Sequence, residues 1–97
     1  MIVKWSLQAK NSLSCIYDYI FKDNPNNALY VFETLYELGE SLSNEHVLFP
    51  IDPIINQIQY RHITKWNYKI IYEVIENEVI ILDIFHGKQN PNKLDKY

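Results

Sequence analysis

Basic side chains are the residues of this sequence that are best suited to do chemistry. Arg61, Lys65 and Lys69 lie within residues 54–72, which contain no acidic residue, and Lys88 lies in a second basic stretch at residues 86–97. Such cations bind phosphates or acidic protein segments and stabilise negative charge that develops in a reaction. The chain has a net charge of -3, whereas domains that bind free nucleic acid are usually more basic. The pattern predicts a small positive area on an acidic body, with ordinary solvated lysines as the alternative.

His86 joins Arg61 as a candidate for catalysis. His86 follows a mostly apolar run and could be a general base near physiological pH or a hydrogen-bonding structural residue. Arg61 could bind a phosphate or an acidic partner, or it could pair with Glu73 on a neighbouring strand.

Metal and cofactor chemistry is not predicted. The three histidines and Cys15 lack the paired spacing of a metal site, and no cluster of carboxylates accompanies them. With 2 glycines in the chain, a glycine-rich phosphate loop cannot be assembled. Cys15 falls in a predicted helix without an activating motif, which disfavours a Cys/His nucleophilic pair.

Two helices are predicted after a short first strand at residues 2–5. Ser6 can cap the first helix, and the Asn24-Pro25 step ends it and starts the second, because Asn caps helices and Pro suits the first helical position. Apolar residues recur at helical spacing in both segments. They are Leu13, Ile16, Tyr17, Ile20 and Phe21, and then Ala28, Val31, Phe32, Leu35, Leu38 and Leu42. Gly39 in the second pattern either ends that helix early or permits close packing.

Three strands are predicted in the second half of the chain. The alternation begins at Ile54, and turns are expected at Trp66-Asn67, where Asn67 can take a positive φ, and at Asn77. The run 79–85 is expected to be a central strand that is covered on both faces. The result is an α+β fold of order β-α-α-β-β-β, with an antiparallel sheet packed against an N-terminal helical hairpin and the first strand joining the same sheet.

The alternation along these strands also predicts where the basic residues point. One face is expected to carry Tyr60, Tyr68 and Tyr72. Arg61 and Lys69 are then expected on the opposite, exposed face, where adjacent antiparallel strands bring them together. Lys88 and Gln89 follow the end of the last strand. Arg61, Lys69, Lys88 and Gln89 are therefore the candidates for binding a target.

Length and composition indicate one domain that covers residues 1–97. A chain of 97 residues that is 47% hydrophobic and 14% aromatic can build one modest core. No apolar run approaches the roughly 18 residues of a membrane helix, and the single cysteine fits a reducing compartment. We therefore expect a cytoplasmic protein without a membrane segment.

Several short pieces of sequence follow one another in a characteristic order. They are the opening strand with Trp5, Tyr19-Ile20, Asn24-Pro25 with Ala28, Tyr60-Arg61, Tyr68-Lys69-Ile70-Ile71-Tyr72, and Phe85-His86-Gly87-Lys88-Gln89-Asn90-Pro91. In this order they resemble the RelE/ParE superfamily of type II toxin–antitoxin toxins over nearly the whole chain. The resemblance implies a cognate antitoxin as partner, in a toxin–antitoxin hetero-oligomer.

The two branches of this superfamily imply different activities. RelE-like members are ribosome-dependent mRNA endoribonucleases with a concentrated basic site and often a C-terminal tyrosine or histidine, whereas ParE-like members poison DNA gyrase and lack that basic set. Arg61 and Lys69 match basic positions of the RelE pattern. Tyr97 could be the C-terminal catalytic tyrosine of that pattern or part of a frayed terminus, since two extra residues displace it from the expected spacing after Gly87. Ile63, however, stands about where a strand lysine would lie, and Gln89 stands in place of an arginine.

Three features favour the ParE-like branch: the incomplete basic set, the net negative charge of the chain, and an HxxQxP-like tip at residues 86–91. The resemblance then implies inhibition of DNA gyrase, relieved by the antitoxin, without catalysis or a cofactor. The alternatives are a RelE-like mRNA endoribonuclease that acts on ribosome and mRNA, and a non-toxic family member that still binds an antitoxin.

Overall fold

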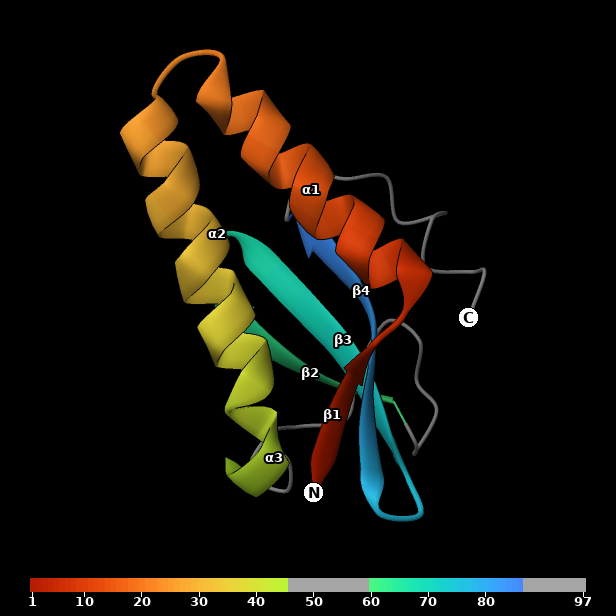
Figure 1. The fold of residues 1–97 in the computed structure, drawn as a ribbon. Helices are drawn as coiled ribbons and strands as arrows, with labels where there is room; N and C mark the ends of the chain where they lie inside the picture. The colour runs from red at the N-terminus through yellow and green to blue at the C-terminus, as the bar shows by residue number, and fades with distance from the viewer. Residues whose placement is uncertain (46–59, 87–97) are drawn as a thin grey trace.

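The computed structural model describes residues 1–45 and 60–86. Its elements are β1 (Ile2–Trp5), α1 (Leu7–Phe21), α2 (Pro25–Glu40), α3 (Leu42–Glu45), β2 (Tyr60–Lys65), β3 (Tyr68–Ile75) and β4 (Glu78–His86). Figure 1 shows α1 and α2 as a hairpin that lies across one face of the sheet. This arrangement confirms the predicted α+β fold and its order of elements.

Both long helices begin at the residues that the sequence predicts. The Ser6 hydroxyl oxygen accepts a hydrogen bond from the Ala9 backbone N–H at 3.0 Å, and the Asn24 side-chain oxygen accepts one from the Asn27 N–H at 3.1 Å. Each cap satisfies an N–H that has no partner within its helix, which typically stabilises a helix by about 1 kcal/mol. None of the helices in residues 1–45 and 60–86 is long and apolar enough to cross a membrane.

The sheet has the strand order β1-β4-β3-β2. Strands β2, β3 and β4 form the predicted antiparallel meander. β1 pairs in parallel with β4, with Ile2 opposite Glu78 and Trp5 opposite Ile81, so the sheet is mixed rather than antiparallel throughout. Side chains alternate in the same way in either direction, so the sequence pattern left the direction of β1 open.

Two tight turns connect the meander, at residues 66–67 and 76–77. They contain the two described non-glycine residues with positive φ, Trp66 at 54° and Glu76 at 55°. The sequence predicts both turns, but the prediction that Asn67 takes the positive φ is wrong. The predicted start of the second strand at Ile54 lies outside the described residues.

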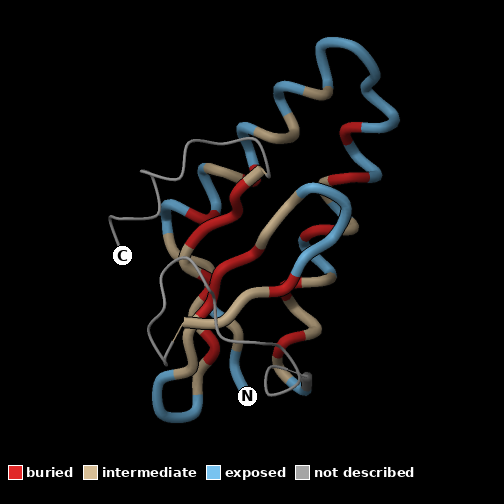
Figure 2. Tube along the Cα trace, turned by 180° about the vertical axis from the view of Figure 1, so that it is seen from behind, coloured by how far each residue is buried: buried red, intermediate tan, exposed pale blue. Residues whose placement is uncertain are grey.

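The main core lies between the helices and the sheet. Its buried members are Ala9, Leu13, Val31, Leu35, Leu42, Ile63, Ile70, Tyr72, Val79, Ile81 and Ile84. A smaller cluster, Ile71 and Phe85 with Leu82, lies on the other face, because alternation turns Ile71 away from its neighbours in the main core. β4 therefore contributes buried side chains to both faces, as predicted for a central strand. Figure 2 shows long buried stretches in the strands and a largely exposed tip of the helical hairpin.

Candidate partner-binding site

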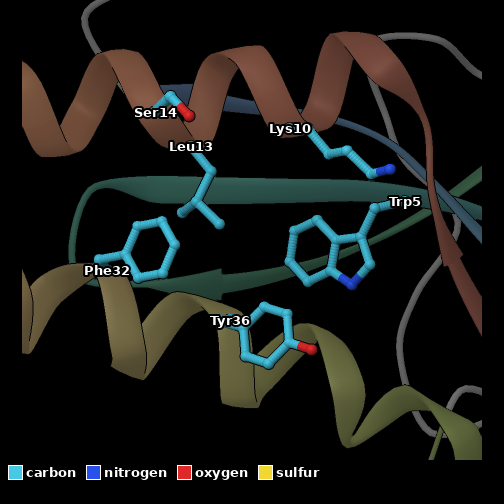
Figure 3. Close-up of a pocket in the computed structure, with 6 residues that line it drawn as sticks. All are labelled: Trp5, Lys10, Leu13, Ser14, Phe32 and Tyr36. Carbon is cyan, nitrogen blue, oxygen red and sulfur yellow. The ribbon is translucent and has the colours of Figure 1, made fainter.

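An apolar pocket of about 340 Å³ opens between the two long helices beside β1. Its lining residues are Trp5 from β1, Lys10, Leu13 and Ser14 from α1, and Phe32 and Tyr36 from α2. Figure 3 shows the side chains of Trp5, Leu13 and Phe32 turned toward the space between the helices. Ligand pockets in proteins typically measure about 300–1,000 Å³, so this one can bury a large apolar group such as a side chain from a partner.

Gly39 allows α2 to approach the indole of Trp5 closely. A Cβ atom at this position would lie 2.5 Å from the Trp5 Cζ2 atom and 2.8 Å from the Ile81 Cδ1 atom, closer than carbon atoms pack. α2 runs through Gly39 to Glu40. Of the two roles that the sequence left open for Gly39, the structure therefore supports close packing rather than an early helix end.

The ring of Trp5 forms one wall of the pocket in a fixed orientation. It stacks on the Tyr36 ring, with the ring centres 5.5 Å apart and the planes 15° apart. Its indole Nε1 is buried and has no hydrogen-bond partner in the described part of the chain. A buried donor without a partner destabilises a fold by about 1–3 kcal/mol, so the packing of the ring must outweigh this loss.

Lys10 supplies the charge of the pocket. Figure 3 shows its side chain extending from α1 beside the Trp5 indole. On the opposite wall, a hydrogen bond to Glu40, reinforced by the negative charge of that carboxylate, raises the pKa of the Tyr36 hydroxyl above its ordinary value of 10.0. The pocket thus combines apolar walls with an ammonium group, a combination that suits an apolar segment bearing an acidic residue.

A buried carboxylate on β4 anchors α1 on the sheet. Asp83 is fully buried, and its oxygens accept hydrogen bonds from Gln8 Nε2 at 2.9 Å, from Ser12 Oγ and from the Ile84 backbone N–H at 2.7 Å. Just before it, the Ser6 hydroxyl donates to the Leu82 carbonyl at 2.7 Å. Sequence reasoning did not identify this network, although Asp83, the one acidic residue in the apolar run 79–85, was a signal for it.

Arg61 and Lys69 lie on opposite faces of the sheet. In the register of β2 and β3, Arg61 is opposite Tyr72, and Lys69 is opposite Thr64. Directly opposed residues share a face, so Arg61 lies on the helix-facing side with Tyr72, while Lys69, the neighbour of the core residue Ile70, points the other way. The predicted common face is therefore wrong, because alternation within each strand does not fix the register between strands.

The same register separates Arg61 from Glu73, which is opposite Tyr60. The pairing considered for Arg61 and Glu73 is therefore wrong as a direct cross-strand pair. Arg61 instead acts on Tyr72: burial raises the pKa of the Tyr72 hydroxyl to about 12, and the Arg61 guanidinium opposes part of that rise.

His86 lies at the end of β4 opposite Tyr68, with the two ring centres 5.1 Å apart and the ring planes 65° apart. Lys88, Gln89 and Tyr97 lie outside the described residues. Within residues 1–45 and 60–86, no group of three or more His, Cys, Asp or Glu side chains is placed to hold a metal ion.

A family model described as the ParE toxin of type II toxin–antitoxin systems, parDE, matches residues 3–91. The chain belongs to this family. The identification agrees with the resemblance seen in the sequence, and it covers nearly all of the elements described above.

Two solved structures show how closely the ParE-family fold is shared. The chain is similar to one from the chromosomal ParDE toxin–antitoxin system of P. aeruginosa, with 25% identity, a TM-score of 0.77, and 89% of this chain and 95% of that chain covered. It is also similar in fold to one from the RelBE2 toxin–antitoxin complex of Mycobacterium tuberculosis, with 17% identity, a TM-score of 0.62 and 88% of each chain covered. No curated protein matched the sequence.

Ile63 lies in the core of the protein, at the position compared with a lysine of RelE-like sites. The resemblance to RelE-like members implies a lysine about there, but Ile63 is only 6% exposed and belongs to the helix-facing core opposite Ile70. A lysine at this depth would have to bury its charge. This position therefore serves packing in the present chain.

Proposed function

We propose that this ParE-family protein is a growth-arresting toxin that inhibits DNA gyrase in the cytoplasm and is neutralised by a cognate antitoxin. The observation that carries the proposal is the family match over residues 3–91. The placement of the basic residues supports the ParE-like activity over RNA cleavage. Arg61 and Lys69 do not share a face, and Ile63 is a core residue, so the concentrated positive charge that RNA cleavage requires is not assembled by these residues.

For the antitoxin, we propose that a short amphipathic segment folds into the pocket between α1 and α2. The pocket offers apolar walls from Leu13 and Phe32 and the ammonium of Lys10. An apolar residue of the segment would fill the pocket, and a neighbouring acidic residue would pair with Lys10. Segments that order on binding commonly lay an apolar helix face into a groove of this kind.

The gyrase activity can be tested with purified protein and purified gyrase. We expect inhibition of supercoiling and stabilised cleavage complexes, and no codon-specific cuts in a primer-extension assay on ribosome-bound message. Codon-specific cuts would replace the proposal with the RelE-like reading. A protein that arrests no growth, yet binds the product of the adjacent gene, would instead be a non-toxic antitoxin-binding member.

The antitoxin site can be tested by charge reversal at the pocket. Co-expression with the product of the adjacent gene, followed by affinity purification, should recover a complex from the parent protein. Lys10→Glu should weaken that complex by roughly 10-fold or more, because a rim cation would become a repelling anion. Lys22→Glu, the same charge change at the end of α1 away from the pocket residues, is the matched control and should bind like the parent. Equal weakening by both variants would contradict the pocket as the docking site.

A further inference from the structure

A second group of large side chains is exposed where β2 ends, β3 begins and β4 ends. We call it the aromatic end and define it by Tyr19, Tyr30, Lys65, Trp66 and Tyr68. Tyr19, Tyr30 and Trp66 are 75%, 61% and 49% exposed. Figure 1 shows the helical hairpin extending past this end of the sheet. Exposed clusters of large apolar side chains are uncommon on monomers and often mark interaction sites.

A contact between side chains joins α2 to the turn at residues 66–67. The rings of Tyr30 and Trp66 have centres 5.9 Å apart, and the Lys65 ammonium lies 5.1 Å from the centre of the Trp66 ring. Burial raises the pKa of Tyr68, and Tyr19 adds a smaller electrostatic contribution. Tyr30, Lys65 and Trp66 are therefore in contact with one another, and the aromatic end shares no residue with the pocket.

The backbone conformation at Trp66 indicates that holding this ring at the surface lowers the stability of the fold. Trp66 has a φ of 54°, a conformation that is an outlier for a bulky residue, while Asn67, a type that tolerates it, is next in the chain. Such conformations cost on the order of 1–3 kcal/mol and are concentrated at functional sites. Here the strained residue also exposes the largest side chain type, which an interface would use as an anchor.

The charge beside Trp66 identifies the kind of partner. Lys65 precedes Trp66, and neither β2 nor the first five residues of β3, up to Tyr72, contains an acidic residue. The Lys65 ammonium lies against an aromatic face, so an approaching acidic group would meet a cation and a ring together. The net charge of the whole chain is -3, which disfavours a polyanion such as nucleic acid and favours an acidic patch on a protein.

We propose that the aromatic end is the surface with which this toxin contacts its target, and that the target presents an acidic protein surface with an apolar side chain that packs on Trp66 and Tyr30. This inference rests on the proposed function. It divides the molecule into a pocket for the antitoxin and a separate end for the target.

The test compares two substitutions that relieve the same backbone conformation. Trp66→Gly removes the ring from the aromatic end. Glu76→Gly changes the other turn residue with positive φ, which lies in the β3–β4 turn and carries no ring, and serves as the matched control. Each variant is expressed as the full chain and measured for growth arrest, for inhibition of purified gyrase, for affinity to the adjacent gene's product and for thermal unfolding.

We expect Trp66→Gly to unfold at a temperature close to or above that of the parent, to bind the adjacent gene's product with unchanged affinity, and to lose growth arrest. Inhibition of gyrase should require roughly 10-fold or more protein, as for loss of a central interface anchor. Tyr30→Ala should also lose growth arrest, to a smaller degree, while its affinity for the adjacent gene's product stays unchanged. This variant tests the role of the aromatic end if Trp66→Gly does not fold. Glu76→Gly should behave like the parent in all functional measurements.

Full growth arrest by both Trp66→Gly and Tyr30→Ala would overturn the inference. Parallel loss of growth arrest and of binding to the adjacent gene's product would overturn it too, because one surface would then serve both partners. If the parent arrests growth without inhibiting gyrase, the target in the proposed function is wrong, and the growth assay still decides the role of Trp66. If the parent does neither, the proposed function and this inference both fall.

Discussion

The two tryptophans are accommodated in opposite ways. Trp5 stacks on Tyr36 and is packed against α2, which makes room for it by having no side chain at Gly39. Trp66 lies in a turn at a φ of 54°, with its ring about half exposed against Tyr30 and Lys65. At Trp5 the neighbouring residue on α2 is a glycine, so the partly buried ring can pack closely against that helix. At Trp66 the backbone is distorted and the ring stays exposed. The first arrangement stabilises the fold, and the second favours contact with another molecule.

The substitution Gly39→Ala, which adds a side chain to α2, should produce the largest effect on stability. A Cβ atom would lie 2.5 and 2.7 Å from two ring carbons of Trp5, and overpacking of this severity costs about 3 kcal/mol, partly offset by about 1 kcal/mol from the better helix propensity of alanine. Urea unfolding of Gly39→Ala measures the net loss. Combining it with Trp5→Leu should recover part of the loss, and a Gly39→Ala variant as stable as the parent would contradict the account of Trp5.

The free energy of unfolding should depend on alkaline pH through Tyr72, a buried residue of the main core. Its pKa is raised from 10.0 to about 12 in the folded protein, so between those values the unfolded chain releases a proton that the folded chain retains. The stabilisation is fully present below pH 10 and is lost as the pH rises toward 12, by on the order of 2 kcal/mol. Chemical unfolding at a series of pH values should give a flatter profile for Tyr72→Phe. Parallel profiles for the two proteins would contradict the prediction.

The hydrogen bond that attaches α1 to β4 through Ser12 should make a moderate contribution to the free energy of unfolding. Ser12→Ala removes one hydrogen-bond donor from the buried carboxylate of Asp83, which should cost about 1–2 kcal/mol. Ser14→Ala, two residues along the same helix and exposed, is the control and should stay within about 0.5 kcal/mol of the parent. Similar losses in both variants would show that helix propensity, not the network, is being measured.

The smallest expected change comes from Glu76→Gly, which isolates the backbone strain from any ring. Glycine adopts positive φ without steric penalty, so this variant should be more stable than the parent by up to about 1 kcal/mol in urea unfolding. Trp66→Gly should gain less, because its ring contacts with Tyr30 and Lys65 are lost as well. A destabilised Glu76→Gly would remove the evidence that positive φ is unfavourable in these turns.

Local signals in the sequence were sufficient to predict the elements of this fold. Ser6, Asn24 and Pro25 define the helix starts by chemistry that acts within three residues. The apolar alternation of β3 predicts its helix-facing side for the same reason, since Ile70 and Tyr72 are core residues. Such features depend on neighbours along the chain, and a single sequence contains them in full.

The features that the sequence did not predict all depend on contacts between distant segments. The register that puts Arg61 opposite Tyr72 involves two strands whose own alternation is satisfied by more than one pairing. The pocket residue Lys10 and the network of Ser12 with Asp83 exist only after α1 has packed on the sheet. Trp66 was expected to precede the strained turn residue, and the ring contacts that accompany its actual conformation come from α2.

The parallel pairing of β1 with β4 has a consequence for how the toxin is made. β4 lies inside the sheet between β1 and β3, yet it is the last of the described strands to be synthesised, and β1 is the first. The helical hairpin therefore has no completed sheet to pack on until residues 78–86 have emerged from the ribosome. Closing a contact between residues so far apart in sequence is a slow step in folding. A chain interrupted before β4 lacks the strand that joins its two halves, so incomplete translation yields no folded toxin.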